Sequence, residues 1–308
     1  MKCTCIIGYG NTGVPNCQVI IDVTKQTVLT PYFKSDGSIN GIDLSAITEL
    51  TQAFIDGKLQ AIDPNERWYP TPEMKNITDE RAEDIVESFD DGTSVKIQDG
   101  ARTFVGLIVG QAPELKGKLD EWACETMGYY AIDKSGNLVG DNSRAGFLDP
   151  IKVQNKSLST IFVKTTDTTT QKIQLSFIID QLMNDANISM INSADITGVL
   201  SGIGGLIDCT GVDATAITTT GFTAKMATGY GTALNPTLAL GLAVDDFGYR
   251  NLTSPSGIED FTSVTETEGT YAFVYDTPVS ASDEIEILHG NVERDKGFEV
   301  VPFKVVTP

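Results

Sequence analysis

Runs of apolar residues predict β-strands along much of the first half of the chain. Residues 93–98 are short and rich in β-branched side chains, and the Asp99-Gly100 pair after them is a strong hairpin signal. Residues 102–109 are apolar enough for a buried strand, and residues 127–132 form another such run before the Ser135-Gly136 turn. The pattern therefore predicts two β-hairpins separated by a different kind of segment.

That segment has the pattern of an amphipathic helix. Pro113 suits the first turn of a helix, where its missing N–H has no partner to lose. Leu115, Leu119, Trp122 and Ala123 fall on one helical stripe, and charged residues occupy most of the other side. We expect Leu115, Leu119 and Trp122 to form the packing core of this helix against the sheet.

The rest of the first half mixes strands, one further helix and long loops. Asp43 is expected to cap a helix over residues 43–56, with Gly57 after its end. Residues 82–89 fit a helix or a strand, and the Asp91-Gly92 turn after them favours the strand. Further strands are expected at residues 3–7, 17–23, 27–33, 151–154, 159–164 and 172–180, and extended loops at 24–40, 60–77 and 148–170.

After residue 196 the amino-acid composition changes: charged residues are fewer, glycines cluster and no helical pattern is present. About seven short strands in about 100 residues are typical of an immunoglobulin-like sandwich. Tyr271, Phe273 and Tyr275 alternate onto one face of a strand at 270–275. The other strands are expected at 206–210, 214–225, 237–244, 260–265, 284–288 and 297–306.

Length and composition suggest a globular protein of two domains. The chain has 308 residues, 41% apolar and 21% charged, and we expect domains at residues 1–196 and 197–308. No apolar run approaches the roughly 18 residues of a membrane-spanning helix, and the N-terminus lacks the features of a signal peptide. We therefore expect a protein that is made in the cytoplasm and has no membrane partner.

The chain is strongly acidic, with 22 basic against 42 acidic residues and a net charge of −20. Residues 1–196 hold 17 basic and 27 acidic residues and residues 197–308 hold 5 and 15, so each half carries −10. Such a surface repels nucleic acid and anionic lipid, which argues against sequence-specific DNA or RNA binding. An acidic wall would suit a protein that lets DNA pass without holding it.

Candidate chemistry is weakly supported. Residues 8–13 (GYGNTG) match the dinucleotide-binding pattern, but Pro15 stands where the helix should run, and Asp22 follows too early for the ribose contact. The only histidine, His289, is expected in a polar turn, where a catalytic triad has no partners. Asp90-Asp91 and Asp245-Asp246 lack the alternating pattern of a calcium loop. We expect no catalytic, cofactor or metal site.

Two residue classes have structural interpretations instead. Cys3, Cys5, Cys17, Cys124 and Cys209 contain no C-x-x-C spacing, which favours small buried thiols over a metal cluster. Most tyrosines lie in apolar runs and are expected in the core. Trp68 and Tyr69, followed by Pro70, lie in a proline-rich loop, so we expect them to be tucked against their own domain or covered by a neighbouring subunit in an assembly.

The order of features across residues 66–140 resembles the tail-tube (major tail) proteins of tailed bacteriophages. The resemblance is carried by ERWYPTPE, by TDERAEDIVESFDDGTSVKIQDGARTFVG and by PELKGKLDEWACETMGYYAIDKSGNLVG, with TTDTTTQKIQLSFIIDQLMND at residues 165–185 in keeping. It covers more than half of the chain, mostly before residue 196, and contains no catalytic motif. The helix expected at 43–56 has no place in the family pattern.

This resemblance implies a mainly β fold: a tail-tube-like sandwich or barrel with one packed helix, and a C-terminal immunoglobulin-like sandwich. It also implies a virion protein that forms rings, commonly hexameric, by sheet continuation and stacks them through long loops. Its partners would be itself, other virion proteins and DNA passing through the bore. Other virion roles (connector ring, capsid decoration or baseplate), a carbohydrate-binding adhesin and an enzyme acting through His289 or Asp22 remain alternatives.

Overall fold

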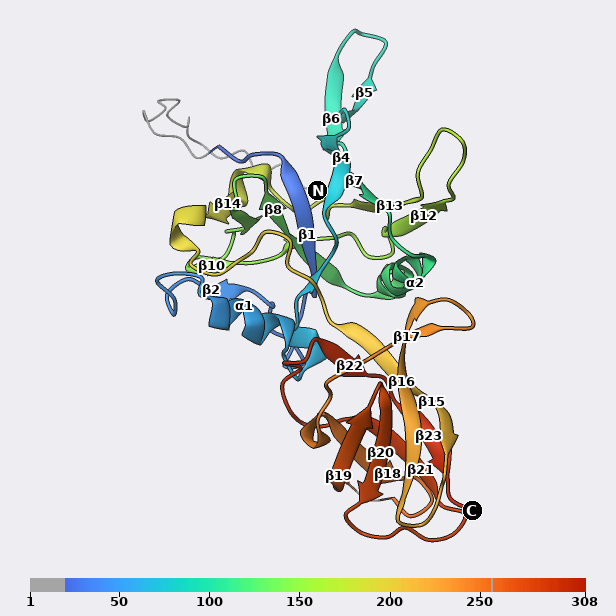
Figure 1. Ribbon diagram of the computed structural model, residues 1–308. Coiled ribbons are helices and arrows are strands. Elements are labelled where there is room, and N and C mark those ends of the chain that lie inside the picture. Colours follow the sequence, from blue (N-terminus) through green and yellow to red (C-terminus); the bar gives the residue numbers. More distant parts are fainter. Residues whose placement is uncertain (1–19, 256) are drawn as a thin grey trace.

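The computed structural model describes residues 20–255 and 257–308, and it is mainly β (Figure 1). Two β-rich bodies follow one another along the chain. The first holds two short helices and two core clusters, built from residues between Val28 and Leu200. The second holds a separate core, built from residues between Cys209 and Val305. The expected strands at 3–7 and the GYGNTG motif at 8–13 lie outside the described residues.

The larger sheet of the first body is organised around one fully buried strand. All seven residues of β8 (Met127–Asp133) are buried, which confirms the strand predicted from its continuous apolar run. β1 (Thr24–Pro31) pairs antiparallel with β8 along its whole length, so the extended loop expected at residues 24–40 is wrong for its first half. The order is β14-β9-β8-β1-β3, with β11 also beside β8; the others are β3 (Tyr69–Pro70), β9 (Leu138–Asp141), β11 (Ile151–Lys152) and β14 (Ile188–Ile191).

A four-stranded sheet packs against the larger sheet. Its strand order is β12-β13-β7-β4. Alternate residues of β7 and β13 are buried, as expected for strands with one face on the core. Phe104 and Phe177 stack with ring centroids 4.8 Å apart, next to Tyr129 of the larger sheet. The strands are β4 (Met74–Arg81), β7 (Arg102–Val109), β12 (Ser159–Val163) and β13 (Lys172–Ile178).

The predicted amphipathic helix is α2 (Pro113–Glu121), continued by the short 3₁₀ helix η2 (Trp122–Cys124). It lies along β12 (Figure 1). Leu119 is buried in the core of the two sheets, and Leu115 and Trp122 are half-buried against the same core. The helical stripe read from the sequence therefore does face the sheet.

Strand β6 has only one of the two neighbours that its flanking turns predicted. β6 (Ser94–Gln98) pairs with β5 (Ile85–Ser88) through a turn in which Gly92 takes a φ of 82°. The hairpin expected at Asp99-Gly100 is wrong, because both edges of β7 are already occupied by β4 and β13. The strand expected within residues 82–89 is confirmed as β5.

The first helix begins later than the sequence suggested. α1 (Gln52–Leu59) is capped by Thr51, whose side chain accepts a hydrogen bond from the Phe54 backbone N–H, and Gly57 lies inside it. Asp43 instead ends β2 (Ile42–Asp43), which pairs with β10 (Phe147–Leu148). The helix predicted over residues 43–56 is therefore wrong in its first half, where the apolar spacing reflects packing of irregular chain.

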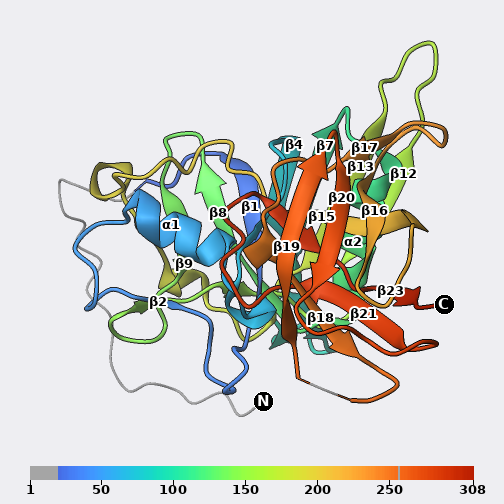
Figure 2. The same ribbon diagram turned by 60° about the horizontal axis from the view of Figure 1, so that its bottom comes forward.

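The second body is one curled path of strands, β22-β15-β16-β20-β19-β18-β21-β23, with β17 beside β16 (Figure 2). Within it, β15-β16-β20-β19 and β18-β21-β23 follow the strand order of the two sheets of an immunoglobulin-like sandwich. Here β19 also pairs with β18 and joins the two sheets at one edge. The bounds are β15 (Ile207–Thr215), β16 (Gly221–Gly231), β17 (Pro236–Leu238), β18 (Phe247–Asn251), β19 (Glu259–Thr267), β20 (Thr270–Tyr275), β21 (Glu284–His289), β22 (Phe298–Val300) and β23 (Phe303–Val306).

Most expected strands of this body are present. Tyr271, Phe273 and Tyr275 all point into the core, as their alternation predicted. β18 was missed, and the strand expected at 297–306 is split into β22 and β23, which belong to opposite sheets.

Four further 3₁₀ turns are η1 (Pro64–Glu66), η3 (Asp185–Asn187), η4 (Ser193–Asp195) and η5 (Val244–Asp246).

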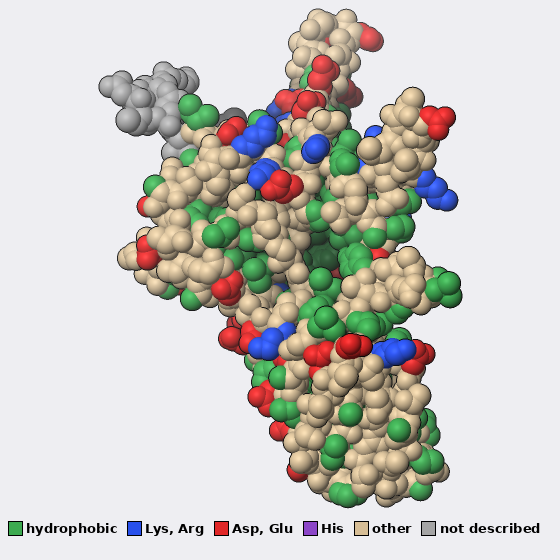
Figure 3. Space-filling view, viewed as in Figure 1, with side chains coloured by type: hydrophobic (Ala, Val, Ile, Leu, Met, Phe, Trp, Pro, Cys, Tyr) green, Lys and Arg blue, Asp and Glu red, His purple; other side chains and the backbone are tan. Residues whose placement is uncertain are grey.

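Direct ion pairs join the two bodies. Lys118 on α2 lies 2.7 Å from Asp208 on β15, and Arg67 lies 3.1 Å from Glu299 on β22. In Figure 3 acidic and basic side chains gather along this border, whereas the rest of the visible second body is mostly uncharged. The second body is thus held against the first by charged side chains rather than attached only through the chain at residues 198–206.

Candidate functional site

The hairpin of β5 and β6 stands clear of the rest of the molecule (Figure 1). Every residue of β5 is exposed, and so are most of those of β6. The apolar side chains on it are each about half exposed: Ile85, Val86, Phe89, Val95 and Ile97. The hairpin therefore presents a group of aliphatic and aromatic side chains that the chain itself does not cover.

A network of ion pairs holds the base of this hairpin. Arg102 donates two hydrogen bonds to Asp79, at 2.6 and 2.8 Å, and a third to Asp185 at 2.8 Å. Arg81 also binds Asp185, at 3.0 and 3.1 Å. Burial alone would lower the pKa of Arg102, but the hydrogen bonds and charge of Asp79 raise it, so this guanidinium stays charged. The strands that carry the hairpin are therefore fixed where it leaves the body.

The four-stranded sheet ends in two strand edges that no other strand of the described residues covers. β12 pairs only with β13, and β4 pairs only with β7. β12 contains no proline, no charged residue and no bulge, and Ile161 at its centre is 51% exposed. β4 has a bulge near Asn76 but runs regularly from Thr78 to Arg81. An unprotected edge of this kind is a template for pairing with another chain.

The face of this sheet that points away from the core carries few charges. On β4 and β13 it holds Lys75, Glu80 and Lys172. Its other members are polar or aliphatic: Thr78, Thr103, Val105, Leu107, Val109, Ser159, Ile161, Val163, Gln174, Ser176 and Ile178. In a chain of net charge −20, this face is close to neutral.

The residues expected to mediate assembly lie in two environments. Trp68 is only 1% exposed and packs between Phe54 and Tyr130, with ring centroids 6.1 and 5.6 Å away. Its side chain is therefore tucked against its own domain and offers no surface to another subunit. Tyr69 and Pro70 form the edge strand β3 and stay half-buried, so they keep some accessible surface.

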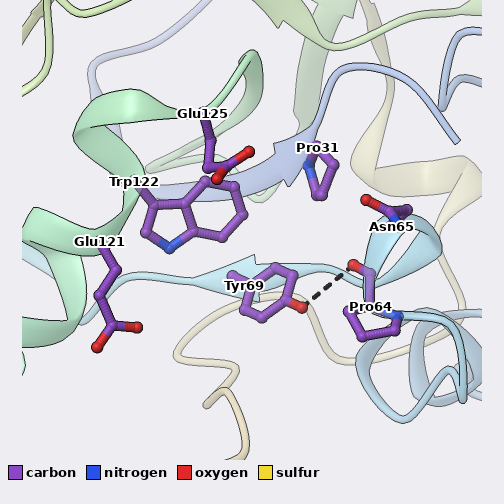
Figure 4. A pocket seen from close by; sticks show the side chains of 7 residues that line it. All are labelled: Pro31, Pro64, Asn65, Tyr69, Glu121, Trp122 and Glu125. Carbon is purple, nitrogen blue, oxygen red and sulfur yellow. Dashed lines mark hydrogen bonds between the residues drawn. The ribbon is translucent and has the colours of Figure 1, made fainter. Parts of the chain in front are cut away.

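A groove opens beside Tyr69, with a volume of about 380 Å³ (Figure 4). The rings of Tyr69 and Trp122 meet edge to face with centroids 4.9 Å apart, and the Tyr69 hydroxyl donates a hydrogen bond to the Pro64 carbonyl. Pro31, Pro64 and Asn65 line one side, and Glu121 and Glu125 flank Trp122 on the other. The sequence places these residues far apart, and the helical stripe assigned Trp122 to the packing core without indicating that it is partly exposed.

The residues considered for chemistry have structural partners. His289 is buried at the end of β21, not in a solvated turn, and its Nδ1 accepts a hydrogen bond from the Val300 backbone N–H at 3.1 Å. Burial, followed by the charge of Arg294, lowers the pKa of His289 to about 4, so the imidazole is neutral near pH 7. Asp22 accepts hydrogen bonds from the Val23 N–H and the Ser135 hydroxyl.

The carboxylate pairs and cysteines also fail to form a site. Asp91 binds Thr93 within the hairpin turn, and Asp246 binds the Ala243 N–H at the start of η5. Cys209 is buried, which raises the pKa of its thiol to about 12, whereas Cys124 is exposed, contrary to the expectation of a buried thiol. Within residues 20–255 and 257–308, no cluster of three or more potential ligands is arranged around a metal position.

Comparison with protein-family models, with curated proteins and with solved structures found no match to this chain. No helix in the described part of the chain is long and apolar enough to cross a membrane.

Proposed function

We propose that this protein is a non-enzymatic virion component that polymerises into stacked rings and forms the tube of a phage tail, through which DNA passes. The observation that carries this proposal is the pair of uncovered edges on the four-stranded sheet. The β12 edge lacks charges, proline and bulges, so it would promote uncontrolled aggregation unless a specific partner covers it. A second copy of the chain supplies such a partner.

The strand directions of the sheet favour this pairing. β12, β13, β7 and β4 are antiparallel to each neighbour in turn, so β12 and β4 run in opposite directions. A neighbouring copy related by rotation therefore places its β4 antiparallel to β12, and the sheet continues in the same pattern. Such a head-to-tail contact closes into a ring when the rotation divides a full turn.

The position of the core decides which face would line the bore. The larger sheet and α2 pack on the core face of the four-stranded sheet, so they fit only on the outside of a ring. The open face would then line the bore, with Lys75, Lys172 and Glu80 as its charges. This bore is nearly neutral rather than acidic, and it would pass DNA because it offers few phosphate contacts.

The β5–β6 hairpin supplies contacts between rings. Its exposed apolar side chains would be buried if the hairpin reached the next ring, and each fully buried side chain of this size contributes roughly 1.5–3 kcal/mol. The ion pairs of Arg81 and Arg102 fix the direction in which the hairpin leaves the body. Ring closure and ring stacking thus depend on separate surfaces.

Electron microscopy of the purified protein at high concentration tests the proposal with three variants. Ile161→Lys puts a charge on the β12 edge and should abolish rings, while Leu182→Lys, at a side chain 81% exposed outside the sheet, should leave them intact. Val86→Lys on the hairpin should leave single rings but prevent tubes. Particles that stay monomeric in the unmodified protein would contradict the proposal, and rings that never stack would indicate a connector ring instead.

A further inference from the structure

The groove beside Trp122 and Tyr69 has no role in the proposed ring or its stacking. Its volume of about 380 Å³ is within the usual size of a small binding pocket. Both aromatic rings are half-buried, so each is held by its own packing and still has a face or edge open to the groove. The two prolines opposite them add apolar surface without backbone N–H donors.

The charges around the groove are of one sign. Glu121 and Glu125 line it, and no lysine or arginine does. Lys118 lies 3.5 Å from Glu121 but binds Asp208 more closely, at 2.7 Å, and the Glu121 side chain stays 69% exposed. Within the described residues, no ion pair involves Glu125. The groove therefore combines the negative faces of aromatic rings with carboxylates that are free to bind a cation.

We propose that this groove binds an arginine side chain carried by an extended segment of a different, basic protein. A guanidinium stacks on an indole ring and donates paired hydrogen bonds to a carboxylate, which an ammonium group cannot do in the same way. The guanidinium carbon of Arg67 already lies 5.9 Å from the centre of the Tyr69 ring, so we assign the incoming guanidinium to the indole of Trp122.

The arginines of the chain itself exclude a second copy as the occupant. All six are engaged in ion pairs within the described structure: Arg67, Arg81, Arg102, Arg144, Arg250 and Arg294. A copy of net charge −20 would also be repelled by the two glutamates. A basic partner brings both the missing guanidinium and the opposite charge.

A titration of the intact protein with an arginine-containing, proline-flanked peptide tests the proposal. The chain has two tryptophans, and Trp68 is buried, so a fluorescence change reports on Trp122; calorimetry gives an independent affinity. The same peptide with citrulline, the uncharged isostere, should bind at least about tenfold more weakly, and a lysine peptide several-fold more weakly. Equal affinities for the arginine and citrulline peptides would overturn the proposal, and equal arginine and lysine affinities would overturn the choice of arginine.

Matched variants locate the contact. Glu125→Gln should weaken arginine-peptide binding by at least about threefold, whereas Glu83→Gln, the same charge change on an exposed residue outside the groove, should leave it unchanged. Equal effects of the two variants would mean general charge attraction and would refute the site. Self-association that Glu125→Gln abolishes, measured by sedimentation, would make a second copy the occupant and would also refute it. None of these results depends on ring formation.

Discussion

Glu299 is the residue whose loss should most disturb the contact between the two bodies. Its carboxylate accepts hydrogen bonds from Arg294 at 2.9 and 3.3 Å and forms an ion pair with Arg67 at 3.1 Å. These arginines are only 4% and 6% exposed. Glu299→Gln keeps the shape of the side chain but removes the negative charge that pairs with both guanidinium groups.

The expected cost follows from burial. Removing one partner of a buried ion pair typically costs about 3–5 kcal/mol, because the remaining charge stays desolvated without compensation. The Glu299 side chain is 20% exposed, so water relieves part of this penalty, and we expect a loss of about 3 kcal/mol. Glu284→Gln is the matched control: its partner Lys304 and Glu284 itself are 54% and 43% exposed, so solvent screens the pair and the expected loss is much smaller.

Urea unfolding followed by tryptophan fluorescence measures both variants. Trp68 is adjacent to Arg67 in the sequence, and its buried indole reports on loss of the surrounding core. Introducing Glu299→Gln into an Arg67→Met background should cost less than in the unmodified protein, because one of the two uncompensated charges is gone. A loss for Glu299→Gln no larger than that for Glu284→Gln would refute the view that this cluster is a desolvated link between the bodies.

Three further predictions concern the helix and the buried histidine. Leu119→Ala should reduce the free energy of unfolding by about 2–4 kcal/mol, and Leu115→Ala by less, as measured in urea, because only Leu119 is fully buried. Gly117→Ala should raise the free energy of unfolding by about 0.5–1 kcal/mol in the same assay, because the new methyl group meets no atom within 4 Å in α2; a loss would contradict this geometry. Since the pKa of His289 falls from 6.5 to about 4 on folding, the unfolded chain binds its proton first as pH drops. As the pH falls from 6.5 to 4, the free energy of unfolding of the unmodified protein should therefore decrease by up to roughly 3 kcal/mol more than that of His289→Gln. Above pH 6.5 the two proteins should show the same pH dependence of stability.

Local patterns were sufficient for strands and for the helix wherever burial follows a regular period. The apolar run of β8, the alternation of β20 and the stripe of α2 each depend on neighbours a few residues away, and each was predicted close to its true bounds. The helix expected from Asp43 was wrong because Ile47 and Leu50 bury their side chains from irregular chain, where periodic spacing arises without helical hydrogen bonds.

Pairing between strands could not be read in the same way. The Asp99-Gly100 pair has the residues of a hairpin turn, but β7 already has a partner on each side, and β6 therefore folds back on β5. Likewise, the proline-rich loop left open whether Trp68 and Tyr69 are tucked against their own domain or covered by a neighbouring subunit. In the structure Trp68 is part of the core, and Tyr69 forms one wall of a groove. Which of two adjacent aromatic residues is covered depends on chain segments that lie far away in the sequence.

The amino-acid order alone was enough to establish a mainly β protein with one sheet-packed helix at residues 113–121, because these features depend on contacts within a turn or along a strand. The candidate sites required the folded chain. The groove combines Pro31, Tyr69 and Trp122, and the open edges exist only because of which strands found partners. Hydrophobic periodicity acts over a few residues, whereas sheet pairing and groove formation join segments that no short-range pattern connects.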